Sequence, residues 1–309
     1  MRSKRLLIFA SCLLQFSFAY SQRIDTSIFA APIVMDTVVI NAIEAGWDLN
    51  AFILKMKRDT TFYRAFKNIR FANYNQTTDL FAYNEDGQKI DSLHLSSKQV
   101  YKNKCRTTQI INQASNKHFY KRDGSYKYYT ASLFDYLFFN TKTICNEIDG
   151  SVVNTANVKQ RSYLEKSKDQ LKQLLFNPGK DVKGIPFIGN KARLFDAEEI
   201  NKYEFSLSSG WLNEEACWIF SIKPKSVFKD DLIYNNIKTW FRKSDDAIIK
   251  RQYALSYSTW FYQFDVTMMV NTISIGNKLF PSYIHYKGNW HIFGKDAERI
   301  SCTSALQYP

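Results

Sequence analysis

Large apolar residues and polar residues alternate along the C-terminal part of the chain, between Cys217 and Cys302. In segment 260–270 every second residue is large and apolar, namely Trp260, Tyr262, Phe264, Val266, Met268 and Val270. Successive side chains of a β-strand point to opposite faces of a sheet, so a period of two predicts half-buried strands. The same alternation at 203–207 and 218–222 extends the prediction to a meander of antiparallel strands.

The N-terminal half of the chain contains several stretches with apolar residues at helical spacing. This spacing predicts helices over 36–46, 48–56 and 61–66, and further helices that begin at Thr130 and Ser162. Each helix carries a single apolar stripe. A single stripe implies that the helices cover a sheet or a groove.

Strands are predicted between the helices as well, over 69–113. They include a hairpin with the turn 85–88, because its Asp-Gly pair favours positive φ. Gly288-Asn289 is predicted to close the last hairpin for the same reason. That turn would place His285 and His291 on opposite faces, so no shared metal site is expected.

Together these patterns predict an α+β fold: a curved antiparallel β-sheet, an unclosed half-barrel, with helices packed over its concave face. Residues 22–309 are expected to form one domain, with a helical or loop insert around 140–196. The Pro- and Gly-rich segment 177–190 is interpreted as a long connection inside that domain, since strands resume soon after it.

Residues 1–21 have the pattern of a signal peptide. Three basic residues precede the apolar stretch 6–18, and small residues allow cleavage near Ser21 or Gln22. The alternative, a lipoprotein box ending at Cys12, lacks the expected upstream Leu and would divide the apolar stretch. We therefore expect an exported protein, periplasmic or associated with the envelope. Cleavage would lower the formal net charge from +13 by the three basic residues.

Four cysteines remain after cleavage: Cys105, Cys145, Cys217 and Cys302. An even number in an oxidising compartment permits two disulfides. We favour Cys105–Cys145 and Cys217–Cys302, which pair within each half of the chain, with buried free thiols as the alternative. No Cys-x-x-Cys spacing occurs, so zinc and redox chemistry of that type have no support.

The sequence contains none of the common catalytic motifs, neither Gly-x-Ser-x-Gly, His-Glu-x-x-His nor a Gly-rich phosphate loop. Its paired carboxylates, such as Asp245-Asp246, lie in expected turns. We expect no catalytic residue, no cofactor and no metal. Lys and Arg are spread along the chain, so nucleic acid is not an expected partner, whereas an anionic membrane surface suits the basic excess. A purely solubilising charge is the alternative.

Aromatic residues make up 16% of the chain. On a curved sheet, large rings can line an apolar ligand cavity or fill a core. The candidate lining residues, for each of which core packing is the alternative, are Trp218, Phe220, Trp260, Tyr262, Phe264 and Met268. The candidate contacts to anionic headgroups are Lys238, Arg242, Lys250 and Arg251.

The order of elements and the segments 218–223 and 237–251 resemble the outer-membrane lipoprotein-sorting superfamily of LolA-, LolB- and RseB-like proteins. Segment 237–251 has that group's arrangement of strand, polar acidic turn and strand, and 203–207 and 279–290 lie where further strands would be. The resemblance implies an unclosed β-barrel with helices as a lid over a cavity that binds acyl chains. It carries no catalytic residues. The insert around 140–196 departs from the superfamily.

The sequence therefore predicts a non-enzymatic envelope protein that binds a lipid or a lipoprotein acyl group, with an outer-membrane protein as a candidate partner. The first alternative is a structural or interaction protein that docks onto an envelope protein through a sheet edge. The second is an exported hydrolase, which would need two convergent ionisable groups in a polar cleft.

Overall fold

The computed structural model describes residues 49–116, 118–135, 138, 141–147, 174–179, 189–260, 262–292 and 296–309. The predicted signal peptide, the helix predicted over 36–46 and most of the helix predicted from Ser162 lie outside these residues. Most of the predicted insert does so too.

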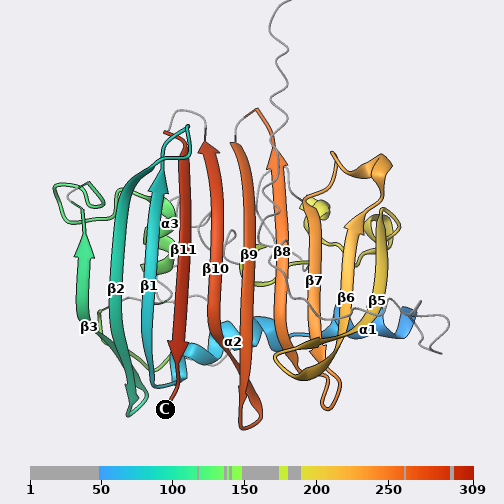
Figure 1. The fold of residues 1–309 in the computed structure, drawn as a ribbon, viewed down its shortest axis with the longest axis horizontal. Coiled ribbons are helices and arrows are strands. Elements are labelled where there is room, and N and C mark those ends of the chain that lie inside the picture. The colour runs from blue at the N-terminus through green and yellow to red at the C-terminus, as the bar shows by residue number, and fades with distance from the viewer. Residues whose placement is uncertain are drawn as a thin grey trace, which may run out of the picture.

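The strands are β1 Tyr74–Tyr83, β2 Lys89–Lys102, β3 Cys105–Ser115, β4 Ile144–Cys145, β5 Tyr203–Leu212, β6 Glu215–Pro224, β7 Tyr234–Arg242, β8 Ile248–Ser258, β9 Tyr262–Ile275, β10 Lys278–Ile292 and β11 Glu298–Gln307. In the described part of the chain these eleven strands form one sheet, in the order β4-β3-β2-β1-β11-β10-β9-β8-β7-β6-β5 (Figure 1). All neighbouring pairs are antiparallel. The sheet is not closed, and the predicted α+β class with an open antiparallel sheet is confirmed.

The helices are α1 Leu49–Arg58, α2 Thr61–Asn68, α3 Tyr129–Phe134 and α5 Ala197–Ile200, with 3-10 turns η2 Ile69–Phe71, η5 Gly189–Ala192 and η6 Ser226–Phe228. Helices α1, α2 and α3 lie on one face of the sheet, here called the covered face; the opposite face is called the open face (Figure 1). In α2, Phe62, Ala65 and Phe66 form the buried stripe that the sequence predicts. No helix in the described ranges is long and apolar enough to cross a membrane.

The covered face carries the main core. Along β9, Phe264, Val266, Met268 and Val270 are at most 1% exposed, which confirms the alternation expected for this segment. A second, smaller apolar cluster on the open face consists of Leu212, Cys217, Ile219, Trp240 and Ile249. The part of the sheet formed by β5–β8 is therefore apolar on both faces.

Two Gly-Asn pairs occur near the end of the chain, and the sequence prediction selected the wrong one. Gly276-Asn277 forms the turn between β9 and β10, with a positive φ of 57° at Gly276. Gly288-Asn289, predicted as a turn, lies inside β10 and pairs with β9. At position 288 a Cβ atom would lie 2.0 Å from Oη of Tyr286, so glycine is needed there for space.

The two histidines of β10 consequently lie on the same face, contrary to the prediction. His285 pairs with Met269 and His291 with Gln263, both on the open face. Six residues of extended strand separate the two rings by roughly 20 Å. Among the described residues, no group of three or more His, Cys, Asp or Glu side chains lies close enough to hold a metal ion.

One of the two predicted disulfides is present in the structure. Cys105 and Cys145, opposite each other on β3 and β4, form a disulfide. Cys217 and Cys302 are free and buried, so the second predicted disulfide is wrong. The reason is their placement: Cys217 lies in the open-face cluster on β6, whereas Cys302 lies in the covered-face core on β11, with four strands between them.

Candidate functional site

Aromatic rings fill the space between α1–α2 and strands β6–β8. Phe52 of α1 contacts Phe220, with ring centroids 5.1 Å apart, and Phe241, at 5.2 Å. Phe62 of α2 faces the ring of Tyr253 at 6.5 Å. Because all of these rings are nearly fully buried, the interface between helices and sheet is packed as a protein core is.

Two short segments complete the cover over this face. Tyr253 donates a hydrogen bond to the carbonyl oxygen of Leu175. Tyr234 accepts a hydrogen bond from the backbone N–H of Gly179 at 2.7 Å and donates one to Ala192 O at 3.2 Å. Burial raises the pKa of both tyrosines, so both hydroxyls stay neutral.

A narrow cleft remains between the helices and the sheet. Its lining residues are Met56, Asp59, Phe62, Tyr63, Asn177, Pro178, Phe195, Ile222, Ile237 and Arg251. Its volume of about 10 Å³ is room for one water molecule. An acyl chain can enter only if the helices move.

Arg251 of β8 points to the covered face and is 5% exposed. Its Nε donates a hydrogen bond to Oγ1 of Thr239 at 3.1 Å, and its guanidinium lies 4.2 Å from the ring centroid of Phe62. Among the described residues, Nη2 has no hydrogen-bond acceptor. Burial lowers the pKa of Arg251, with Asp59 opposing that shift. The cleft therefore contains a desolvated cation whose Nη2 group can still donate hydrogen bonds.

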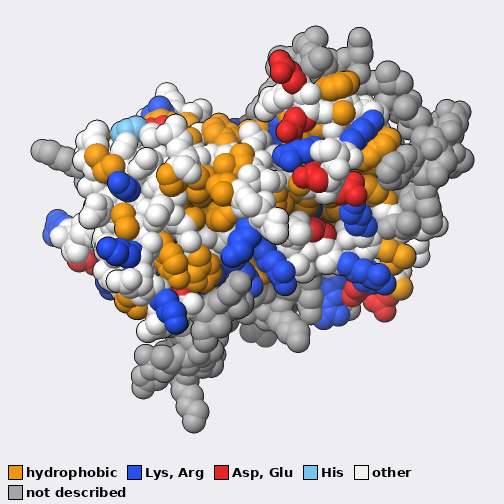
Figure 2. Space-filling view, turned by 90° about the horizontal axis from the view of Figure 1, so that it is seen from below, with side chains coloured by type: hydrophobic (Ala, Val, Ile, Leu, Met, Phe, Trp, Pro, Cys, Tyr) orange, Lys and Arg blue, Asp and Glu red, His pale blue; other side chains and the backbone are white. Residues whose placement is uncertain are grey.

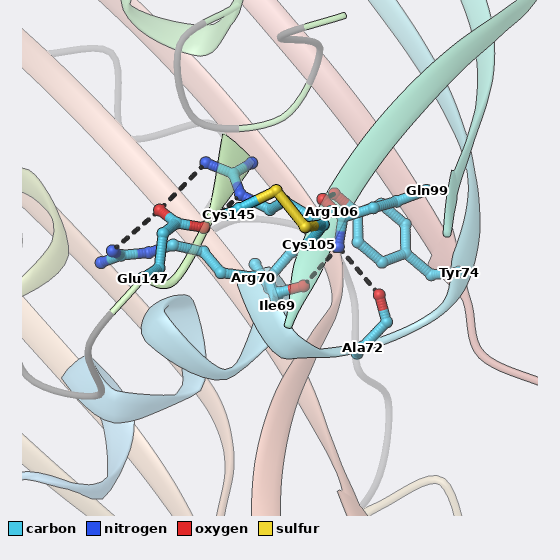
Figure 3. A network of polar contacts seen from close by, with 9 residues as sticks. All are labelled: Ile69, Arg70, Ala72, Tyr74, Gln99, Cys105, Arg106, Cys145 and Glu147. Carbon is cyan, nitrogen blue, oxygen red and sulfur yellow. Dashed lines mark hydrogen bonds and ion pairs between the residues drawn. A yellow bond between two sulfur atoms is a disulfide. The ribbon is translucent and has the colours of Figure 1, made fainter. Parts of the chain in front are cut away.

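The end of the helical segment that follows α2 is fixed to β2. The side chain amide of Gln99 donates hydrogen bonds to the carbonyl oxygens of Ile69 at 2.7 Å and Ala72 at 2.8 Å (Figure 3). Gln99 is fully buried. The side chain of Gln99 thus holds the backbone at the end of η2 against β2.

A carboxylate strengthens this attachment. Glu147 accepts from Nε of Arg106 at 2.6 Å and from Nη1 of Arg70 at 3.4 Å, so it bridges η2 and β3 (Figure 3). The disulfide Cys105–Cys145 lies beside it and holds the short strand that leads to Glu147. We call the contacts of Gln99, Glu147 and this disulfide the anchor.

Helix α1, at the other end, is held differently. Its polar contacts include the ion pair of Lys55 with Asp246 at 2.6 Å, in which both side chains are more than 40% exposed. Lys57 also donates to Phe195 O at 3.1 Å. Exposed ion pairs contribute little to stability, so the ring of Phe52 provides much of the attachment of α1.

The predicted lining residues are placed as follows. Phe220, Phe264 and Met268 are buried in the core of the covered face, and their contact with a ligand stays a prediction. Trp218 lies on the same face, partly buried, with Nζ of Lys243 3.9 Å from its ring centroid. Trp260 is 77% exposed and precedes β9, so its placement in the lining was wrong.

The side chain of Tyr262 lies outside the described part of the structure. Sequence reasoning missed Phe52, Phe62, Phe241 and Tyr253 as members of the interface. The signal was present, since Phe52 belongs to the predicted apolar stripe of its helix.

The four predicted headgroup contacts do not form one site. Lys238 and Lys250 lie on the open face, each with Nζ 5.0 Å from the ring centroid of Trp240. Burial lowers the pKa of both lysines, and neighbouring lysines add to this effect. Arg242 pairs with carboxylates near the β7–β8 turn. Arg251 is on the covered face, so the expectation of a surface contact was wrong for it.

No protein-family model matches the sequence, and no curated protein matches it. Among solved structures, a DUF1329 family protein from Desulfovibrio piger is similar at a TM-score of 0.24 and 10% identity, over 87% of this chain and 94% of that chain. A protein domain from Vibrio parahaemolyticus, described as outer membrane lipoprotein-sorting, is similar at a TM-score of 0.26 and 10% identity, over 79% and 91%. The second description agrees with the resemblance in the sequence, but similarities this low carry no argument, and the fold class rests on the strand order itself.

Proposed function

We propose that the protein is a non-catalytic envelope protein that holds an acyl chain between helix α1 and the covered face of the sheet. The observation that carries this proposal is the contrast between the two ends of the helical segment. The η2 end is fixed by the anchor, whereas α1 rests on the sheet through the buried side chains of Phe52 and Met56, one part-buried hydrogen bond of Lys57 and an exposed ion pair. Movement of α1 about η2 would open the cleft without unfolding the sheet.

The surface around the helices supports contact with lipid. Figure 2 shows the molecule from below, relative to the orientation of Figure 1. On this side apolar side chains form patches with Lys and Arg side chains among them. On α1 itself, Leu54 is 51% exposed. Apolar patches next to basic groups are typical of surfaces that approach anionic lipid. The disulfide Cys105–Cys145 supports an oxidising compartment, and so export.

A second candidate is docking onto an envelope protein through the edge of the sheet. The edge strand β5 carries Trp211, which is 49% exposed. An exposed aromatic residue on an edge strand suits addition of a strand from a partner. Loss of a partner on Trp211→Ala, with acyl binding absent, would favour this candidate.

Binding of radiolabelled methyl palmitate, a neutral acyl probe, tests the first proposal. Phe52→Ala removes the ring that occupies the interface, so we expect this variant to bind the probe several-fold more tightly than the wild type. Leu54→Ala, on the exposed side of the same helix, is the matched control and should bind as the wild type does. Absence of saturable binding to both the wild type and Phe52→Ala would refute the proposal.

A further inference from the structure

The guanidinium of Arg251 is a buried charge without a counter-ion in the part of the chain that the structure describes. Among the described residues it forms no ion pair, and its one hydrogen bond there goes to the neutral hydroxyl of Thr239. A buried cation that is only partly hydrogen-bonded destabilises the folded state. The cost of burying such a guanidinium is offset when an anionic ligand binds to it.

The polar neighbours of Arg251 are already engaged or too far away. Asp59, which lines the same cleft, accepts hydrogen bonds from the backbone N–H and the hydroxyl of Thr61, at 3.1 and 2.6 Å. It raises the pKa of Arg251 through space, but forms no ion pair with it. Within the described ranges, Nη2 of Arg251 is thus left without an acceptor, beside a cleft lined mainly by apolar side chains.

We propose that Arg251 binds the carboxylate of a long-chain fatty acid whose chain lies in the interface between α1 and the sheet. This inference rests on the proposed function and narrows its ligand class from any acyl group to a free carboxylic acid. The carboxylate would take the hydrogen bonds of the free guanidinium edge. The chain would lie against the rings of Phe220 and Phe241 once Phe52 moves away.

The lining of the cleft favours a carboxylate over a phosphate. A guanidinium offers a planar fork that matches a carboxylate in two parallel hydrogen bonds. Arg251 is the one cation among the described lining residues, and Asp59 adds a negative charge nearby. A single positive charge next to a carboxylate suits a monoanion and disfavours a dianion.

The inference predicts effects of opposite sign for one substitution. Arg251→Met keeps most of the side chain length but removes the charge. In the ligand-free protein it should leave stability unchanged or raised, because a buried charge is lost. The same substitution should lower the affinity for palmitate. A residue with a purely structural role would lower stability and would not distinguish an acid from its ester.

The experiment compares radiolabelled palmitate with radiolabelled methyl palmitate on the wild type, Arg251→Met and Arg251→Lys, with urea unfolding of each ligand-free protein. The wild type should bind the acid at least about tenfold more tightly than the ester, because only the acid forms charge-assisted hydrogen bonds. Arg251→Met should lose this preference. Arg251→Lys, which keeps the charge but not the fork, should retain part of it. Arg242→Met, at a surface ion pair, is the matched control and should keep the full preference.

The outcomes separate this inference from the proposed function. Equal affinity of the wild type for acid and ester, or full preference in Arg251→Met, would overturn the role of Arg251 and leave acyl binding intact. Absence of binding for both probes, in the wild type and in Phe52→Ala, would remove the proposed function itself. Stabilisation by inorganic phosphate, lost in Arg251→Met, would overturn the assignment to a carboxylate.

Discussion

Nε of Arg106 donates a hydrogen bond of 2.6 Å to Oε2 of Glu147. Glu147 follows the disulfide-bonded Cys145 by two residues. The side chain of Arg106 is only 6% exposed and that of Glu147 is 18% exposed. This pair therefore depends on β4 staying in place. Since Glu147 also reaches Arg70, the covalent bond between β3 and β4 supports the position of the helices above the sheet.

Removal of the disulfide should loosen the anchor. In the variant Cys105→Ser/Cys145→Ser we expect a loss of up to about 4 kcal/mol in the free energy of unfolding, because a crosslink over 40 residues restricts the unfolded chain. Urea unfolding with and without reductant measures it. Reductant should bring the wild type to the value of the variant and leave the variant unchanged; a reductant effect of equal size on both would contradict the prediction.

Glu147→Gln tests the carboxylate separately from the disulfide. The substitution leaves the buried guanidinium of Arg106 with a neutral acceptor, so we expect a loss of about 2 kcal/mol. Glu85→Gln is the control, because its carboxylate is 85% exposed and 3.8 Å from Arg299, and it should change stability by less than about 0.5 kcal/mol. Equal losses in urea unfolding would show that Glu147 has no special role.

Helix α1 should open more often than η2. Native-state hydrogen exchange reports this difference, because amides in a locally opening element exchange without global unfolding. We expect the amides of Leu49–Arg58 to exchange faster than those of Ile69–Phe71 and of β8. Uniform protection across α1, α2 and η2 would argue against movement of α1 as a lid.

Gly288→Ala should destabilise the protein although it lies in a regular strand. The new Cβ would meet Oη of Tyr286 at 2.0 Å and Nε1 of Trp290 at 3.0 Å. Overpacking of this kind costs about 1–3 kcal/mol. The loss should shrink in a Tyr286→Ala background, since the clashing ring is gone. Additive losses in thermal unfolding would refute this explanation for the glycine.

Stability should fall as the pH drops below about 6.5 because of His285. Burial lowers the pKa of this histidine, and Lys287 adds to the shift. Between the folded-state pKa and 6.5 the unfolded chain binds more protons than the folded one, so acidification favours unfolding. Urea unfolding at about pH 8 and pH 5 should show a smaller difference for His285→Gln than for the wild type. His291→Gln, exposed on the same face, is the control and should retain the wild-type difference.

The local pattern of the sequence predicted most of the strands, because alternation reports directly which face of a sheet is buried. It could not select between Gly276-Asn277 and Gly288-Asn289, since the two pairs look the same until the ring of Tyr286 is placed over one of them. The sequence pattern likewise placed the start of β9 two residues too early, which put Trp260 among the candidate lining residues. Local pattern cannot fix where pairing with a neighbouring strand begins.

The candidate site was less predictable than the fold. Arg251 has the same parity as Tyr253 and Leu255, both buried on the covered face, so its direction was readable from the alternation. A basic residue is nevertheless expected at a surface, and its burial follows only from the helices above it. The face on which Cys217 lies depends in the same way on strand order, which no short segment encodes.

The pairing of β1 with β11 has a consequence for how the molecule is made. Asn75 meets Gln307, so these two neighbours leave the ribosome on the order of 200 residues apart. The hairpin of β1 and β2 emerges early, while the backbone N–H and C=O groups on the β11 side of β1 still lack partners. It must remain unaggregated until β11 is available. Loss of the last ten residues would leave two half-sheets, each with a bare hydrogen-bonding edge, and the cell would have to shield both or degrade them.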